Sequence, residues 1–396
     1  MSDTDPTRCT SVLIVGAGIG GGLTAAVALQ HAGIAVTVLE RAPELREVGA
    51  GLALWPNAVG ALRRLGLGDA VERVAARMHR TDLRDWRGQV IHHSTTEGIE
   101  ARFGAPVMMI HRADLHAALR CALDGDVVQL GATVQAVEQD GAGVRVDRTD
   151  GDALRADVAI GADGLNSVVR AALLADGPPT YSGLTAWRAV LAATDAVVTR
   201  VTGSETWGHG SIFGMQRLSA NRIYWYAATR APEGDPVPYD TQKQALLDRF
   251  GTWHAPIPEL LAATPATALL SNGLYDRPST QRIASGRVAL LGDAAHPMLP
   301  YLGQGACQAI VDGVVLAEAL AEEPDPGLAL ARYRVHRHTQ TAAAVRQSRL
   351  MSRVAHVRPL PAVVVRNALL RLTPPASALK RLEPVLTSDP APSTRR

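Results

Sequence analysis

Apolar stretches and glycines divide the N-terminal part of the chain into short alternating elements. Residues 11–15 (SVLIV) are almost wholly apolar, which is typical of a strand buried on both faces. A glycine-rich segment, residues 16–22, separates this strand from a helix predicted over residues 23–32. A second apolar run, residues 36–39, ends at Glu40. The pattern predicts a strand, a tight turn, a helix and a second, parallel strand.

Alternating apolar and polar positions dominate the middle of the chain. Residues 81–93 alternate around a turn at Arg87-Gly88. Aromatic and β-branched residues are concentrated in residues 181–228, which favours a β-sheet. Further short strands with hairpin turns at Gly141 and Asp150-Gly151 are predicted at residues 127–136, 143–148 and 153–157.

Helical periodicity marks most of the remaining chain. Helices are predicted over residues 58–65, 241–250, 304–320 and 327–354, and Arg112 precedes a further helix that ends at residue 122. A proline-broken, arginine-rich segment follows, and we expect the last ten residues to be disordered.

The combined pattern predicts an α/β fold with two interleaved domains. A Rossmann-like nucleotide-binding domain is expected from residues 1–75, 101–175 and 277–330. A β-sheet substrate domain is expected from residues 76–100 and 176–276, and residues 331–396 are expected to form C-terminal helices and the tail.

Composition and charge narrow the functional classes. Of the 396 residues, 47% are hydrophobic and 20% are charged, which supplies enough apolar sequence for a buried core. The net charge of +2 includes no long basic run, so nucleic-acid binding is not expected. No stretch reaches the roughly 18 apolar residues that a membrane span needs. Cys9, Cys121 and Cys307 lie too far apart to indicate a disulfide framework or a metal site. We expect a cytoplasmic protein without a membrane or nucleic-acid partner.

The glycine-rich turn has the chemistry of a dinucleotide site. Gly16, Gly18 and Gly21 allow backbone amides to approach a pyrophosphate at the N-terminus of a helix. Glu40 is placed to accept hydrogen bonds from a ribose. An extra glycine, Gly22, precedes the helix, which leaves open whether Gly21 or Gly22 packs against the strand.

Two further strands end in an aspartate. One ends at Asp163, followed by Arg170 at helical spacing, and these two side chains either pair or bind a cofactor. The other, residues 288–291, ends at Asp293, and a loop leads to a helix that begins near Gly303, Gly305 and Ala306. A carboxylate at a strand end, followed by backbone amides at a helix start, suits a large, partly anionic cofactor.

The three motifs occur in one order along the chain: Gly16-x-Gly18-x-x-Gly21, Asp163-Gly164-x-x-Ser167-x-x-Arg170 and Gly292-Asp293-Ala-Ala-His-Pro297. Together they resemble those of the class A flavoprotein monooxygenases, which share the fold of para-hydroxybenzoate hydroxylase. The resemblance implies an FAD-binding domain interleaved with a β-sheet substrate domain.

The resemblance also implies roles for individual residues. Glu40 and Arg41 would bind the adenosine part of FAD, and Arg112 would contact its flavin side. Asp293 would contact FAD near the ribityl-pyrophosphate portion. Asp163 and Arg170 belong to a motif associated with both FAD and NAD(P)H.

Family chemistry implies reduction of FAD by NAD(P)H, capture of O2 as a flavin C4a-hydroperoxide and hydroxylation of an aromatic or polyketide-like small molecule. A non-oxygenating flavin oxidoreductase or an epoxidase is the alternative. A flavin-dependent halogenase is disfavoured because the Trp-x-Trp-x-Ile-Pro segment is missing. A flavin-binding protein without catalysis is a third hypothesis. The choice between NADH and NADPH, and between monomer and homodimer, stays open.

The substrate site is expected between the sheet and the flavin loop. Tyr224 and Tyr301 are the best hydrogen-bonding candidates for catalysis. Arg188 is expected either to bind a substrate carboxylate or to form a salt bridge within the sheet. Other substrate candidates are Ile212, Gly214, Gln216 and Tyr226 on the sheet and Pro300 on the loop.

Several features weigh against simpler hypotheses. Ile212 and Gln216 stand where hydroxybenzoate-type relatives carry a His or Tyr that activates a phenol, which weakens a simple hydroxybenzoate assignment. His296 is expected to shape its turn rather than to act as an acid or base. His336-x-His338 has no partner acids at ligand spacing, so no metal is expected.

Overall fold

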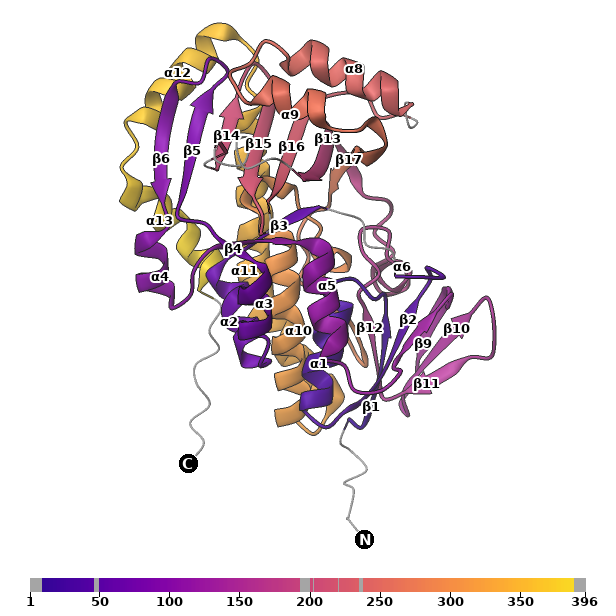
Figure 1. Ribbon diagram of the computed structural model, residues 1–396. Coiled ribbons are helices and arrows are strands. Elements are labelled where there is room, and N and C mark those ends of the chain that lie inside the picture. The colour runs from indigo at the N-terminus through magenta and orange to yellow at the C-terminus, as the bar shows by residue number, and fades with distance from the viewer. Residues whose placement is uncertain are drawn as a thin grey trace.

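The computed structural model describes residues 9–45, 50–192, 200–201, 203–219, 221–234 and 238–387, and the statements below concern these residues. Residues 388–396, within the tail that was expected to be disordered, lie outside this part. Two sheets form separate layers, and the C-terminal helices run along both (Figure 1). This arrangement confirms the predicted α/β fold.

The first layer is a six-stranded, mainly parallel sheet. Its strand order is β18-β19-β12-β1-β2-β8, and only β18 is antiparallel to its neighbour. Strands β19, β12 and β1 are adjacent and parallel. The three sequence motifs that follow them therefore meet at the carboxyl-terminal end of the sheet. The strands are β1 (Ser11–Val15), β2 (Ala35–Glu40), β8 (Val128–Leu130), β12 (Val158–Gly161), β18 (Ala284–Ser285) and β19 (Val288–Leu290).

Two closely packed helices lie beside this end of the sheet. Helix α1 (Gly22–His31) packs against α10 (Gly305–Glu322). A Cβ on Gly313 of α10 would lie 2.8 Å from the backbone nitrogen of Ala25 in α1, so the two helices approach more closely than side chains would allow. Both helices therefore begin at the same end of the sheet, beside the motifs.

The segment predicted as one strand over residues 127–136 forms parts of two strands, so that prediction was wrong. Strand β8 joins the six-stranded sheet, whereas β9 (Val134–Gln139) joins a three-stranded sheet with β10 (Val144–Arg148) and β11 (Leu154–Ala156). Gly131, whose φ is +71°, allows the chain to turn between them.

The second layer is a seven-stranded sheet. Its order is β17-β13-β16-β15-β14-β5-β6, and β14 runs parallel to β5 while the other neighbours are antiparallel. Helices α8 (Tyr239–Phe250) and α9 (Ile257–Ala263) cover its outer face (Figure 1), and α9 was not predicted. The strands are β5 (Arg80–Asp85), β6 (Val90–Thr95), β13 (Thr180–Ala192), β14 (Ser204–Trp207), β15 (Ser211–Arg217), β16 (Arg222–Arg230) and β17 (Leu270–Asp276).

A small sheet lies between the two layers. It consists of β3 (Gly51–Leu54), β7 (Met108–His111) and β4 (Ala76–Arg77). Ala50 and Met109 here pack against Tyr224 of the seven-stranded sheet. The helices near this sheet are α2 (Pro56–Arg64), α3 (Gly68–Val74), α4 (Glu97–Phe103) and α5 (Arg112–Cys121), whereas α6 (Val168–Leu174) packs against β9 and β12.

The described part of the C-terminal segment consists of helices joined by short connections. Helix α11 (Pro326–Ala355) packs against α10 and against the short turn η3 (Pro300–Leu302), and α12 (Leu360–Arg371) and α13 (Pro375–Leu386) follow. Thus the proline-broken segment forms two helices. None of the helices in the described ranges is both long and apolar enough to cross a membrane.

Candidate functional site

The structure settles how the extra glycine fits into the dinucleotide turn. Helix α1 begins at Gly22, and a Cβ there would lie 1.8 Å from the carbonyl oxygen of Gly16. A Cβ on Gly21 would lie 2.2 Å from Cδ1 of Leu291, the residue after β19. Gly22 therefore packs against the turn that follows β1, and Gly21 packs against the end of β19. A side chain at Gly22 would clash with backbone, and one at Gly21 would require the Leu291 side chain to move.

Glu40 ties the second strand to the same turn. One oxygen, Oε2, accepts a hydrogen bond from the backbone nitrogen of Ala17 at 2.9 Å, and Oε1 accepts one from Ala42 at 2.9 Å. Arg41 follows and is exposed. The predicted adenosine-binding pair thus lies directly beside Gly16 and Gly18, where the resemblance places a nucleotide.

A buried carboxylate fixes the turn at Gly292. Asp312 accepts hydrogen bonds from the Gly292 nitrogen at 2.9 Å, from His296 Nε2 at 2.5 Å and from Arg337 Nε at 2.6 Å. Burial opposes ionisation, but the charges of His296 and Arg337 outweigh it and hold the pKa of Asp312 far below its usual range. His296 is therefore engaged in shaping the turn.

Asp293, the next residue after Gly292, is accessible to solvent, although the surrounding protein desolvates its carboxylate. Burial raises its pKa, and the positive charges of His296 and Arg112 oppose the shift. A Cβ on Gly305 would lie 3.9 Å from Asp293 Oδ1, so the start of α10 and this carboxylate share one space.

The second motif holds the third motif in place through hydrogen bonds from Arg170. Arg170 is buried, and its Nη1 donates to the carbonyl oxygens of Ala294 at 2.8 Å and Ala295 at 2.9 Å. Its salt-bridge partner is Asp176, so the alternative in which Asp163 and Arg170 pair is wrong. Asp163 instead accepts a hydrogen bond from the Val168 nitrogen at 2.7 Å through Oδ2.

These residues fit FAD. Oδ1 of Asp163 is buried and has no partner in the described part of the chain, as expected for a group that awaits a ligand. Gly303, at φ +61°, and Gly305 leave the backbone at the start of α10 free of side chains. A carboxylate, open amides and the Arg112 guanidinium together offer the donors and acceptors that a flavin and its phosphates require.

The seven-stranded sheet presents a regular array of side chains toward this space, which we call its inner face. Register pairs Arg188 with Tyr226, Tyr226 with Gly214, and Gly214 with Glu205, so these four form one row across β13, β16, β15 and β14. Tyr224 and Gln216 pair in the row on one side, and Ile212 pairs with Trp207 in the row on the other side. The predicted substrate residues of the sheet thus share one face.

The middle row contains Glu205, a residue that sequence reasoning missed. Tyr226 donates a hydrogen bond to Glu205 Oε2, and Trp207 Nε1 donates to Oε1. The Tyr226 ring reaches Glu205 by crossing Gly214, where a Cβ would lie 2.1 Å from Cζ of Tyr226. Burial raises the pKa of Glu205, which makes its carboxylate a stronger proton acceptor, although the two hydrogen bonds oppose the shift. The alternation of Glu205 and Trp207 was the only available signal.

Tyr301 is held by a second residue that sequence reasoning missed, His356. Its hydroxyl lies 2.6 Å from His356 Nε2, and His356 Nδ1 lies 2.9 Å from the Gly210 carbonyl oxygen. Because that carbonyl can only accept, Nδ1 donates to it and Tyr301 donates to Nε2. Burial lowers the pKa of His356 to about 4.

Because the pKa of His356 is lowered in the folded chain, we expect the free energy of unfolding to depend on pH. The imidazole binds fewer protons in the folded chain than in the unfolded chain, where its pKa is about 6.5. Its contribution is therefore complete above about pH 6.5 and is lost as the pH falls toward 4, by about 3 kcal/mol in total. Urea unfolding across this range should show the slope in the wild type and a weaker slope in His356→Gln. The exposed His336→Gln variant should keep the wild-type slope; equal slopes in all three would contradict the assignment.

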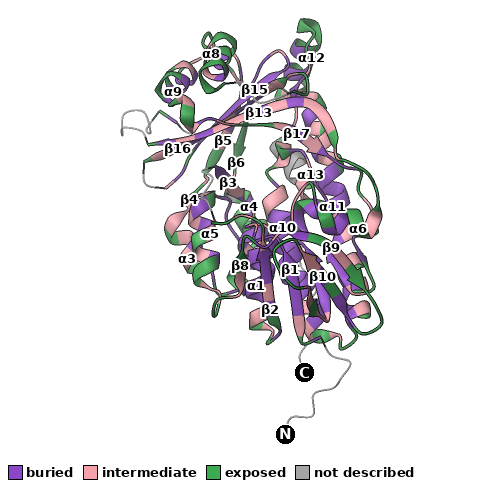
Figure 2. Cartoon of the chain, turned by 90° about the vertical axis from the view of Figure 1, so that its right-hand side faces the viewer, coloured by how far each residue is buried: buried purple, intermediate pink, exposed green. Residues whose placement is uncertain are grey.

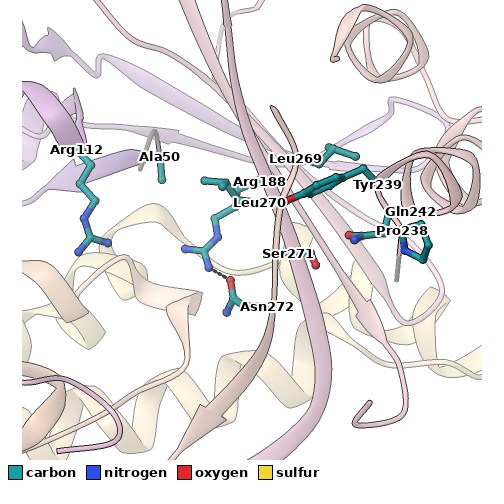
Figure 3. A pocket seen from close by; sticks show the side chains of 10 residues that line it. All are labelled: Ala50, Arg112, Arg188, Pro238, Tyr239, Gln242, Leu269, Leu270, Ser271 and Asn272. Carbon is teal, nitrogen blue, oxygen red and sulfur yellow. Dashed lines mark hydrogen bonds between the residues drawn. The ribbon is translucent and has the colours of Figure 1, made fainter. Parts of the chain in front are cut away.

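A cavity of about 600 Å³ opens at the β17 edge of the sheet (Figure 3). Arg112 and Arg188 extend into it, and Arg188 Nη2 donates to Asn272 Oδ1. The salt bridge offered as an alternative for Arg188 is not found among the described residues, and its Nε has no partner there. The lining residues are Ala50, Arg112, Arg188, Pro238, Tyr239, Gln242, Leu269, Leu270, Ser271 and Asn272. Of the predicted site residues, only these two arginines line it.

Comparisons with known proteins agree with this geometry. A family model described as an FAD binding domain matches residues 9–348. The aurachin C monooxygenase/isomerase of Stigmatella aurantiaca is 40% identical over 362 residues, covering 91% of this chain and 94% of that protein. The 3-amino-4-hydroxybenzoate 2-monooxygenase of Streptomyces cremeus is 36% identical over 372 residues, covering 92% and 93%.

Solved structures give the same result in three dimensions. The crystal structure of Klebsiella pneumoniae HpxO complexed with FAD and uric acid superposes with a TM-score of 0.90 at 30% identity, covering 96% of this chain and 97% of that chain. Family model, relatives and architecture converge with the three motifs. The chain belongs to the class A FAD-dependent monooxygenases of aromatic compounds.

Proposed function

We propose that this FAD-dependent monooxygenase uses NAD(P)H and O2 to hydroxylate an aromatic or polyketide-like small molecule. The observation that carries the proposal is that two polar surfaces face each other, one suited to the cofactor and one to the substrate. The cofactor edge offers Asp293 and the glycine-rich start of α10, while the inner face of the sheet offers a polar row between apolar neighbours. A flat ring held between them would be positioned for oxygen transfer.

The chain's own residues supply the cofactor site. We assign the pyrophosphate to Gly16, Gly18 and Gly21, and the adenosine part to Glu40 and Arg41. The flavin side would lie near Asp163, Asp293 and Arg112, with the amides of Gly303, Gly305 and Ala306 directed at the ring. Bound FAD supplies the redox and oxygen chemistry, which no amino-acid side chain can provide.

On the substrate side, the residues position a ring and exclude water. Ile212 and the loop residues Leu299 and Tyr301 form an apolar wall along one side of the polar row. Tyr224, which packs against Ala50, lies along the other side. Burial raises the pKa of its hydroxyl to about 12, so the hydroxyl stays protonated at neutral pH. We assign Gln216 and Pro300 to the same walls.

A proton route follows from the middle row. Tyr226 donates to Glu205, so the lone pairs of its oxygen are free to accept a hydrogen bond from a substrate hydroxyl. Transfer of that proton to Tyr226 Oη, with transfer of the Tyr226 proton to Glu205 Oε2, leaves an ionised and more electron-rich ring. Because Tyr301 already donates to His356, we assign it a positioning role.

Replacing Arg188 is expected to weaken substrate binding without loss of FAD. Arg188 lines the cavity and has no carboxylate partner in the described ranges, so an acidic group on the substrate is its natural partner. Removing one charge-assisted hydrogen bond costs about 2 kcal/mol, or about thirtyfold in Kd. Titration of Arg188→Met with an aromatic acid, followed by the flavin spectrum, measures this.

Arg217→Met is the matched control because Arg217 lies exposed on the same sheet. Arg188→Lys should recover part of the affinity, since it keeps the charge but not the planar fork. An unchanged Kd in Arg188→Met would remove this residue from the substrate site.

The proposed activity is tested by the oxidation of NADH and NADPH by the FAD-bound protein. Aromatic acids and phenols that perturb the flavin spectrum should accelerate oxidation, with less hydrogen peroxide formed than NAD(P)H consumed. Stoichiometric peroxide with every compound would favour an oxidoreductase that inserts no oxygen. Failure of both nucleotides to reduce the flavin would exclude the proposed electron donor.

A further inference from the structure

Helix α12 has most of its large apolar side chains directed outward. Five of them are between 53% and 79% exposed, and we call them the apolar face of α12: Leu360, Val364, Val365, Leu369 and Leu372. The buried side of the same helix contains Val363, together with the polar residues Arg366 and Asn367. This distribution is the reverse of what a surface helix in water normally shows.

The polar side chains fix the helix in this orientation. Arg366 Nη1 donates to the Ala355 carbonyl oxygen at 3.0 Å, and its Nε donates to Asn367 Oδ1 at 3.0 Å. Its guanidinium also lies 5.1 Å from the ring centroid of Trp207. Turning the helix to bury its apolar face would break these hydrogen bonds and take the Arg366 donor away from the carbonyl oxygens of Val354 and Ala355. The exposed apolar face is therefore built into the fold.

The helix lies at the periphery of the molecule. It packs against β6, the edge strand of the seven-stranded sheet. Figures 1 and 2 show α12 outermost in both views, with no described element over its outer side. Exposed apolar side chains that are contiguous on one helix mark a docking surface more often than isolated ones do.

The surrounding chain is strongly basic. Residues 326–382 contain no Asp or Glu, although the whole chain has a net charge of only +2. Arg353, Arg358, Arg371 and Lys380 are exposed, and none forms an ion pair in the described part of the chain. The eleven basic residues in this stretch are Arg332, Arg334, Arg337, Arg346, Arg349, Arg353, Arg358, Arg366, Arg371, Lys380 and Arg381.

We propose that the apolar face of α12 docks on the surface of an anionic lipid bilayer. With 12 residues, the helix is about 18 Å long, too short to span a bilayer core of about 30 Å but suited to lie in its interface. Flanking arginines would contact anionic headgroups, and each contributes about fivefold to affinity. The expectation of no membrane partner rested only on the search for a spanning segment.

A second copy of the chain is the less favourable occupant. A two-fold contact would place the same face against itself. Arg358 and Arg371, which flank the apolar side chains at either end of α12, would then meet arginines of the partner with no acidic residue from residues 326–382 to neutralise them. Bilayer lipids offer the opposite charge, so charge complementarity favours the lipid surface.

Co-sedimentation of the full-length, FAD-bound protein with lipid vesicles tests the proposal. Vesicles of phosphatidylcholine mixed with phosphatidylglycerol should bind the wild type, and vesicles of phosphatidylcholine alone should bind it far more weakly. Leu369→Glu and, separately, Val365→Glu should each weaken binding about tenfold or more, because a charge replaces buried apolar surface. Added salt should weaken wild-type binding.

Val335→Glu is the matched control, because Val335 is also exposed but lies on α11 away from this face. It should bind as the wild type does, and flavin absorbance should confirm that every variant is folded. The proposal is overturned if the wild type binds neither vesicle, or if Leu369→Glu and Val335→Glu bind equally. It is also overturned if the wild type is a dimer that Leu369→Glu dissociates while vesicles bind neither protein.

Discussion

Asp293→Ala is expected to lose FAD during purification, with an increase of about a hundredfold in the Kd for FAD. The carboxylate belongs to the third motif, just after strand β19, and lies beside the start of α10. Its removal also leaves Arg112 without the negative charge that stabilises its guanidinium. Both effects act on the cofactor rather than on the sheet, so folding should persist.

Tyr224→Phe is the control for this experiment. Tyr224 lies on the inner face of the sheet, against Ala50, and its substitution should leave FAD content unchanged while it alters turnover. FAD content from the absorbance of the purified proteins, with thermal unfolding as a check on folding, distinguishes the two variants. Equal loss of FAD in both would show that the sheet is placed wrongly relative to the cofactor.

Asp312→Ala is expected to lower the free energy of unfolding by about 3–5 kcal/mol, the usual cost of leaving a buried charge without its partner. Arg337 and His296, both buried, would lose their shared carboxylate, and the Gly292 nitrogen would lose its acceptor. Urea unfolding monitored by circular dichroism measures the change.

Glu322→Ala provides a matched control on the same pair of helices. Glu322 ends α10 and pairs with Arg332 of α11, but both side chains are exposed, so its loss should cost less than about 1 kcal/mol. A similar loss in both variants would contradict the idea that the buried network holds the cofactor turn.

Acid should reduce the difference between wild type and Asp312→Ala. The folded-state pKa of Asp312 lies below its unfolded value of about 3.9, so its contribution is complete above about pH 4. It is lost as the pH falls below 4 toward the folded-state pKa. A difference that stays constant down to strongly acidic pH would show that packing, rather than charge, accounts for the stability.

The cofactor side of the site was predictable because its information is local. Gly16, Glu40, Asp163 and Asp293 each follow a short apolar strand, and parallel strands bring their carboxyl ends together. The extra Gly22 was not resolved by sequence, since its close contact with Gly16 depends on the position of α1.

The substrate side was less predictable because it depends on strand register. Glu205 reaches Tyr226 only because Gly214 separates them on the intervening strand, and no local pattern indicates which strands are neighbours. The outward apolar face of α12 was missed for a similar reason, since its orientation depends on the contact between Arg366 and Trp207.

Isotope labelling tests the central claim most directly. The FAD-bound protein, supplied with NAD(P)H, 18O2 and a compound that perturbs its flavin spectrum, should form a product whose mass shows one labelled oxygen atom. The second oxygen atom should appear in water. Product without the label, or consumption of O2 entirely to hydrogen peroxide with every such compound, would contradict the assignment as a monooxygenase.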